Sequence, residues 1–218
     1  MAAPSAGTLG VIAISIVLVA GFYIGSRLNR LSARDRANWL RTALRGLGTE
    51  PRFSPLGSFG FSTTADWLDG PIRRLSITTL FLPRELPPVW VLRLALGQSD
   101  ALTLRATLAA ALSFEGDALD PRSDYGRRAE RNLPPAWKRA REGGRLLAAP
   151  SEAALNRLRM ALGPVTEEGP VQQIISIRRS APQLLVTVSA PASEAATIGD
   201  IQTVRGLAEA LVGVQNRG

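Results

Sequence analysis

The longest apolar run of the chain extends from Thr8 to Gly25, and its sequence is TLGVIAISIVLVAGFYIG. A helix of about 18 residues is roughly 27 Å long, which is close to the hydrocarbon thickness of a bilayer. No side chain between Met1 and Ser26 carries a charge. The pattern therefore predicts a transmembrane helix over residues 8–25, after a short extracytoplasmic N-terminus over residues 1–7. A cleaved signal peptide and a buried core helix remain the alternatives.

The arginines that follow this run predict its orientation. Arg27, Arg30, Arg34 and Arg36 are accompanied by one acidic residue, Asp35, whereas the segment before the run contains no Lys or Arg. Arginine that flanks a membrane span remains on the cytoplasmic side. We therefore expect a single-pass protein with its N-terminus outside and its C-terminal domain in the cytoplasm. Residues 26–33 would form a basic juxtamembrane segment.

Four later segments have the features of helices. In three of them, leucine, valine, isoleucine or alanine recurs at helical spacing: residues 34–47, 151–162 and about 199–214. The first of these could continue directly from the anchor. The fourth segment, residues 86–96, begins with Pro87-Pro88 and is almost wholly apolar. It either packs on the sheet or lies in the membrane interface, where Trp90 would be favoured.

The remaining apolar segments favour strands, because they are rich in β-branched residues or alternate with polar ones. Phenylalanines alternate with small residues across 53–66, and Gly57 and Gly60 offer a bend. The expected strands cover residues 53–66, 72–83, 101–108, 111–116, 171–179 and 183–190, the last two as a hairpin.

Together these elements predict an α+β protein with one transmembrane helix and a mixed domain of antiparallel sheet and packed helices. A first α+β part would occupy residues 34–116 and a second part residues 150–218. Residues 117–149 are rich in charge and proline, so we interpret them as a polar linker or surface excursion with a short helix near 135–141. Both parts have the order helix, strand, strand, helix, which suggests two related α-β-β-α halves.

The composition limits the chemistry that the chain can perform. Its 218 residues include no cysteine and no histidine, which excludes a Ser–His–Asp triad and metal sites built on thiolate or imidazole. The net charge is +8, and Lys138 is the only lysine among 26 basic residues. A GC-rich genome is the simplest cause of this arginine bias. Arginine nevertheless binds phosphates and carboxylates, and a basic segment is attracted to an anionic membrane surface.

Three polar clusters are candidate functional sites, and the sequence favours structural roles for all of them. Asp66 and Asp69 flank Trp67 and could act as acid and base, but turn formation explains them better. The acidic loop residues Asp117, Asp120 and Asp124 lack the ligand number and the glycine placement of a calcium loop, and nearby arginines neutralise them. A basic stretch from Arg127 to Arg145, which contains Lys138 and Trp137, fits a solvated surface or a lipid-facing patch better than nucleic-acid binding.

The sequence therefore predicts a non-catalytic accessory, adaptor or scaffold component of a membrane-associated assembly. Its expected partners are the lipid bilayer and other membrane-associated proteins; no cofactor, metal or nucleic acid is expected. One alternative is a membrane regulator that binds anionic lipid or nucleic acid through arginine, and another is a carboxylate-dependent enzyme. The candidate membrane-surface residues are Arg27, Arg30, Arg34, Arg36 and Trp90.

Overall fold

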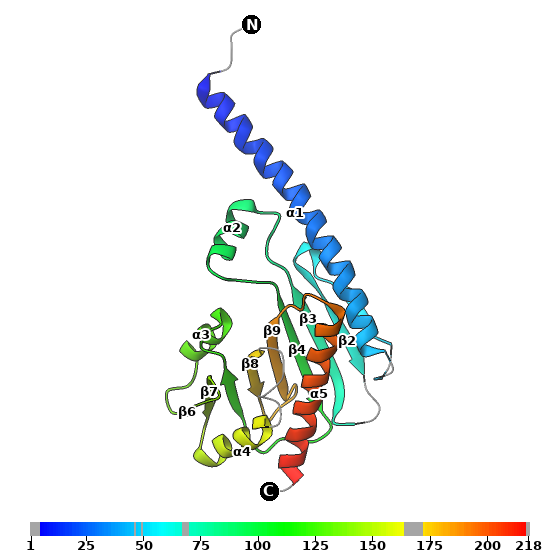
Figure 1. Ribbon diagram of the computed structural model, residues 1–218, viewed down its shortest axis with the longest axis vertical. Coiled ribbons are helices and arrows are strands. Elements are labelled where there is room, and N and C mark those ends of the chain that lie inside the picture. Colours follow the sequence, from blue (N-terminus) through cyan, green and yellow to red (C-terminus); the bar gives the residue numbers. More distant parts are fainter. Residues whose placement is uncertain (1–4, 46, 49, 67–69, 164–171, 217–218) are drawn as a thin grey trace.

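A nine-stranded antiparallel sheet forms the body of the protein, and a long helix extends from it (Figure 1). This computed structural model describes residues 5–45, 47–48, 50–66, 70–163 and 172–216. The strand order is β1-β2-β3-β4-β9-β8-β5-β7-β6, and every pairing is antiparallel. The predicted α+β class is confirmed.

The elements have the following bounds. The strands are β1 (Arg52–Pro55), β2 (Gly60–Asp66), β3 (Ile72–Leu80), β4 (Ala101–Leu108), β5 (Gly116–Leu119), β6 (Lys138–Glu142), β7 (Arg145–Ala149), β8 (Gln172–Ile177) and β9 (Leu184–Ser189). The helices are α1 (Ala6–Leu44), α2 (Pro87–Ala95), α3 (Asp124–Arg131), α4 (Glu152–Leu162) and α5 (Glu194–Asn216), with a 3₁₀ turn η1 at Gly57–Phe59.

Helix α1 is continuous over 39 residues, so the apolar anchor and the predicted helix that starts at residue 34 are one element. The helix begins where the hydroxyl of Ser5 accepts a hydrogen bond from the backbone N–H of Thr8. It ends at Leu44, three residues before the predicted end. Because no turn or loop interrupts it, the apolar segment and the domain are joined by one helix.

One face of the sheet holds the core, because alternate residues of each strand point to that face. Leu75 and Ile77 of β3, Leu104 of β4 and Val186 of β9 are almost fully buried there. The second half of α1, together with α4 and α5, covers this face (Figure 1). Leu40 and Leu44 thereby join the anchor helix to the main hydrophobic core.

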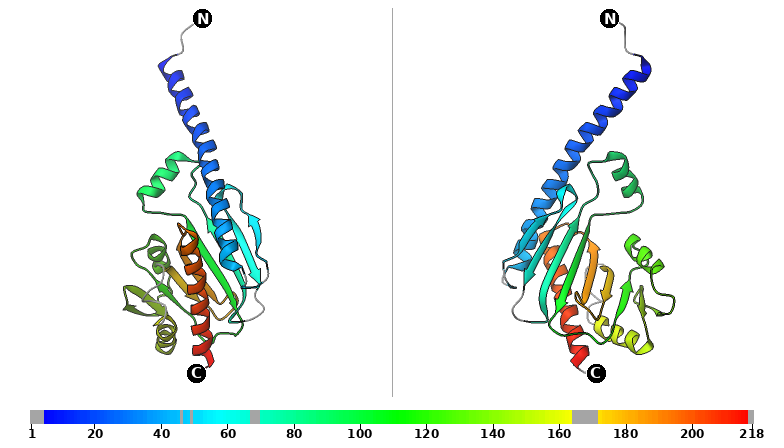
Figure 2. Two further views of the ribbon diagram at one scale, coloured as in Figure 1. Left: turned by 45° about the vertical axis from the view of Figure 1, so that its right-hand side comes forward. Right: turned by 180° about the vertical axis from the view of Figure 1, so that it is seen from behind.

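The opposite face is covered at one end of the sheet. A second, smaller hydrophobic cluster lies there, beside α3. Its buried residues are Leu119, Leu133, Leu146 and Ala148. The strands β2, β3, β4 and β9 lie in front of the helices when the molecule is seen from behind (Figure 2). Hydroxyl residues pair across these strands on the polar face, which is only partly exposed: Thr64 with Ser76, Thr78 with Thr103, and Thr103 with Thr187.

Residues 117–149, which we interpreted as a linker or surface excursion, form regular secondary structure that belongs to the sheet. These residues contribute β6, β7 and most of β5 to the sheet, and their helix is α3 rather than the segment near 135–141. The segment 138–142 is instead the edge strand β6. An edge strand that is solvated on both faces needs few apolar residues, and its charges discourage pairing with other chains. Its sequence therefore resembles a loop.

Three other expectations require correction, and one is unresolved. The strand predicted at 111–116 is β5, which starts only at Gly116. The last helix begins at Glu194 rather than near residue 199. Helix α2 does not pack on the sheet, as the next section describes. The extended segment predicted at 53–66 is divided by the turn η1 into β1 and β2, which pair as a hairpin. The other predicted strands, β3 and β4, and the hairpin β8–β9 are confirmed. The division into two related α-β-β-α halves stays a prediction.

Candidate membrane-proximal site

The first half of α1 is long and apolar enough to span a membrane. Its most apolar 18-residue window has a mean hydropathy of 2.3, and none of that window is buried against the described parts of the protein. A buried core helix would be covered by other elements, so this observation argues against that alternative. Phe22 and Tyr23, near the end of the apolar segment, are exposed and lie edge to face. Aromatic residues at this position are typical of a membrane interface.

Two glycines at the end of the apolar segment bring the rest of the protein against α1. A Cβ atom on Gly25 would overlap the backbone carbonyl of Arg84, and one on Gly21 would overlap the ring of Pro87. The spacing of four residues places both glycines on one side of the helix. The loop between β3 and α2 therefore packs directly on the helix backbone, and α2 begins beside Gly21.

A buried asparagine fixes this contact with hydrogen bonds. The side-chain nitrogen of Asn29, a residue that is 1% exposed, donates to the carboxylate of Glu85 at 2.9 Å and to the carbonyl of Leu82 at 3.3 Å. The same nitrogen lies 3.2 Å from the carbonyl of Ser58 at the tip of the β1–β2 hairpin. Arg84 in turn donates to Oδ1 of Asn29 at 2.6 Å. Asn29 thus joins two separate loops to α1.

Asp100 extends this network to a second turn of α1. Its Oδ2 atom lies 2.9 Å from Nη1 of Arg36 and 2.8 Å from Nη2 of Arg84, while its Oδ1 atom accepts the backbone N–H of Leu82 at 2.8 Å. The Asp100 side chain is 6% exposed. A buried carboxylate with two hydrogen-bond donors and a further ion pair to Arg36 is well compensated, whereas loss of the carboxylate would leave two arginines without their shared partner.

Arg36 is therefore not a free membrane-surface residue, although the sequence grouped it with Arg27, Arg30 and Arg34. Burial lowers the pKa of Arg36 from its ordinary value, and the nearby charge of Asp100 opposes that shift. Its guanidinium also lies over the ring of Phe81, 5.1 Å from the ring centre. The role of Arg36 in this structure is to hold α1 on the domain.

The other three arginines of this group are exposed. Arg27, Arg30 and Arg34 are separated by three and four residues and so share one side of α1. Because the helix rises about 1.5 Å per residue, Arg34 lies roughly 13 Å beyond Gly25 along the axis. That distance exceeds the Debye length of about 8 Å at physiological salt. If the bilayer surface lies near Gly25, Arg27 and Arg30 would feel its charge much more strongly than Arg34.

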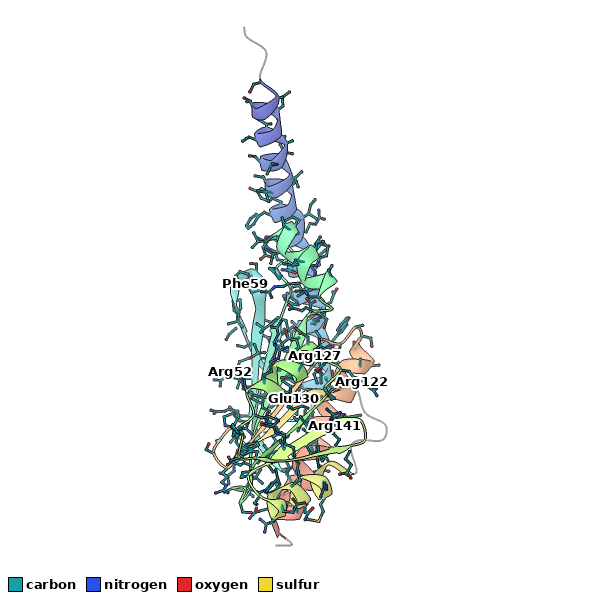
Figure 3. All side chains as sticks on the ribbon, turned by 90° about the vertical axis from the view of Figure 1, so that its left-hand side faces the viewer. Arg52, Phe59, Arg122, Arg127, Glu130 and Arg141 are labelled. Carbon is teal, nitrogen blue, oxygen red and sulfur yellow. The ribbon has the colours of Figure 1, made fainter. Side chains whose placement is uncertain are left out.

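Helix α2 lies beside α1 and away from the core. None of its nine residues, all within the described chain, is buried, and Trp90 is partly exposed. The interpretation of Trp90 as a core residue on the sheet is wrong. Figure 3 shows α2 at the level where the apolar part of α1 meets the domain.

The remaining acidic candidates serve structural roles where the structure describes them. Asp66 pairs with Arg74 at 2.6 Å, while Asp69 lies outside the described residues. Asp117 binds Arg178 at 2.8 Å, and Asp120 accepts a backbone hydrogen bond in the turn before α3. Among the described residues, no group of three acidic side chains is placed to hold a metal ion.

The basic stretch from 127 to 145 is divided among α3, β6 and the start of β7. Arg127 and Arg128 pair with Asp124 on their own helix, and Glu142 pairs with Arg159 of α4. The guanidinium of Arg178 lies over the ring of Trp137, 5.8 Å from the ring centre. In Figure 3 the labelled residues Arg127 and Arg141 lie below α2, on the side of the domain that faces the viewer.

Sequence reasoning did not single out the buried acids Glu85, Asp100 and Asp200. Asp200 differs from the other two because it lies among the helices. A helix over residues 199–214 would place Asp200 in its first turn, but α5 begins at Glu194 and Asp200 is 4% exposed. Burial raises the pKa of Asp200 to about 7. Its Oδ1 atom has no hydrogen-bond partner among the described residues. An earlier helix start, indicated by Ser193 as the first-turn cap, was the signal that could have revealed this position.

Comparison of the chain with protein-family models and with curated proteins gives no match, so the functional argument depends on the fold and this site.

Proposed function

We propose that the protein is a single-pass, membrane-anchored accessory or adaptor protein without catalytic activity. The observation that carries the proposal is the coupling of the anchor to the domain. Helix α1 is continuous from its apolar half into the core, and the contacts of Asn29 and Arg36 fix the adjacent loops to it. A flexible tether would only localise the domain, whereas this connection also sets its height and angle at the membrane.

The surface that such a protein presents to a partner is the polar sheet face. Arg105 is exposed on β4 in the middle of this face, opposite Ser76 on β3 and Leu185 on β9. Arginine is enriched at protein interfaces, since it combines charge with a planar group that donates several hydrogen bonds. We place the partner-binding surface around Arg105, and we place the domain in the cytoplasm because Arg27 and Arg30 flank the anchor.

The proposal is tested by isolating the full chain from membranes in a mild detergent. A stoichiometric membrane-associated protein should copurify and should be lost on Arg105→Glu. Arg205→Glu is the matched control, since Arg205 is exposed on α5 on the helical side of the sheet. Unchanged recovery of the partner with Arg105→Glu would reject this surface. Recovery of no protein partner at all would reject the adaptor function.

A second function is favoured by the exposed arginines next to the anchor. Arg27 and Arg30 could recruit anionic lipid, each with roughly 1 kcal/mol of attraction close to the surface. The protein would then act as a lipid-binding regulator. Stoichiometric anionic lipid in the purified material, lost on the double change Arg27→Gln and Arg30→Gln, would support this function over the adaptor.

A further inference from the structure

Helix α2 is apolar except for one residue, and most of its side chains are exposed. Arg93 is the only charged residue in PPVWVLRLA. A free helix that exposes so many large aliphatic side chains is unstable in water, since each would gain about 1.5–3 kcal/mol from full burial. The six exposed aliphatic residues of α2 and its flanks, each between 38% and 61% exposed, are Leu86, Val89, Val91, Leu92, Leu94 and Leu96.

The position of α2 identifies what covers it. Pro87 packs on Gly21, so the helix starts beside the last turns of the apolar anchor segment. Figures 1 and 3 both show α2 next to the point where α1 leaves the domain. If the first half of α1 crosses a bilayer, then the surface of the same bilayer lies at the level of α2. Lipid reaches these side chains without any additional protein.

A second apolar group lies on the other side of the anchor. Leu56 and Phe59, at the tip of the β1–β2 hairpin, are 43% and 54% exposed. Asn29 holds this tip on α1 through the carbonyl of Ser58, about one helical turn beyond Gly25. In the left view of Figure 2, α2 and the hairpin tip lie on opposite sides of α1.

We propose that α2 lies within the bilayer interface as a second membrane contact, and that the hairpin tip with Phe59 touches the same surface. Trp90 lies at the level of the head groups, and Arg93 extends its charged end to them while its stem remains among the acyl chains. The domain is then supported on both sides of its anchor. This inference rests on the proposed membrane anchoring.

The test uses the absence of cysteine, because a single labelled cysteine can be placed anywhere. The full chain with Leu92→Cys carries an environment-sensitive fluorophore and is reconstituted in phosphatidylcholine–phosphatidylglycerol vesicles. Met160→Cys is the matched control, since Met160 is also 59% exposed but lies on α4, far from the anchor. The label at residue 92 should show blue-shifted emission and lose intensity with spin-labelled lipids, and the label at residue 160 should do neither.

Two results would overturn the proposal. Quenching of the residue-92 label by iodide to the same extent as the residue-160 label would place α2 in water. Protection from both iodide and spin-labelled lipid would show that protein, such as a second copy of the chain, covers α2. A third label at Ile16→Cys separates this inference from the anchoring itself. If spin-labelled lipid does not quench the label at residue 16, the proposed membrane anchoring is wrong. If it quenches the label at residue 16 but not the label at residue 92, only the proposed second contact is wrong.

Discussion

Asp100 joins the start of β4 to the anchor helix, because its Oδ2 atom lies 2.9 Å from Nη1 of Arg36. The two residues are distant in sequence, and the pair is largely shielded from water. Removing one partner of a buried ion pair is costly because the other charge remains buried and uncompensated. This relationship leads to the first prediction.

Asp100→Asn should destabilise the full chain in detergent by about 3–5 kcal/mol, as expected for a broken buried pair. The reason is that Arg36 and Arg84 both lose their carboxylate. Chemical denaturation followed by tryptophan fluorescence measures the change. Glu209→Gln is the control, because the exposed pair of Glu209 with Arg205 on α5 should contribute less than about 0.5 kcal/mol. Equal effects of the two substitutions would contradict the assigned role of Asp100.

Gly25→Ala should disturb the packing of α1 against the loop before α2. A methyl group at this position overlaps the carbonyl of Arg84, and backbone cannot rotate away as a side chain can. Overpacking of this kind typically costs about 1–3 kcal/mol. Spin labels at residues 30 and 93 should show a broader distance distribution in the variant. Gly10→Ala is the matched control, because a Cβ at Gly10 meets nothing within 4 Å; a narrow distribution in both variants would argue against the close contact.

Asp200 should make stability depend on pH. Burial raises its folded-state pKa from 3.8 to about 7. The free energy of unfolding is therefore highest below about pH 4, where Asp200 is neutral in both the folded and the unfolded state, and it falls as the pH rises through 7. Asp200→Asn removes this loss of stability, because an amide does not ionise. The variant should therefore gain stability relative to the natural protein between pH 4 and pH 8, by at most about 4 kcal/mol for a shift of this size. Denaturation curves at both pH values measure the difference, and a constant difference would refute the shift.

The expected orientation can be measured with single cysteines in intact cells. With the N-terminus outside, Ala3→Cys should react with a membrane-impermeant thiol reagent. Arg141→Cys, at an exposed position of β6, should react only after the membrane is permeabilised. Since the natural chain has no cysteine, no background labelling is expected. The reverse pattern would place the domain outside.

The elements predicted correctly are those with a strong local pattern. The anchor is a long apolar run, and α4 combines a Ser151 cap with leucines at helical spacing. Local patterns failed at the sheet edge, where β6 reads KRARE and has no buried side chain among its described residues. Whether such a segment is a strand depends on pairing with β7, which the sequence of β6 alone does not encode.

The candidate site was predicted only in its general location. Arg36 belongs to the same run of charge as Arg27, Arg30 and Arg34, and nothing in that run distinguishes the one that is buried. Arg36 is distinguished by its pairing with Asp100, a residue that follows α2 in the sequence and that the fold brings next to α1. Gly21 and Gly25 likewise read as ordinary residues of an apolar span until the loop before α2 is placed against them.

Because α1 is one continuous helix, a change in the tilt of its apolar half also changes the orientation of the domain. An apolar helix tilts in response to bilayer thickness, upright in a thick membrane and inclined in a thin one. The 19 residues from Ser26 to Leu44 form an arm of roughly 28 Å, so a change of about 10° in tilt moves its far end by about 5 Å. Movement between membranes of different thickness would therefore swing the sheet and reorient whatever it holds.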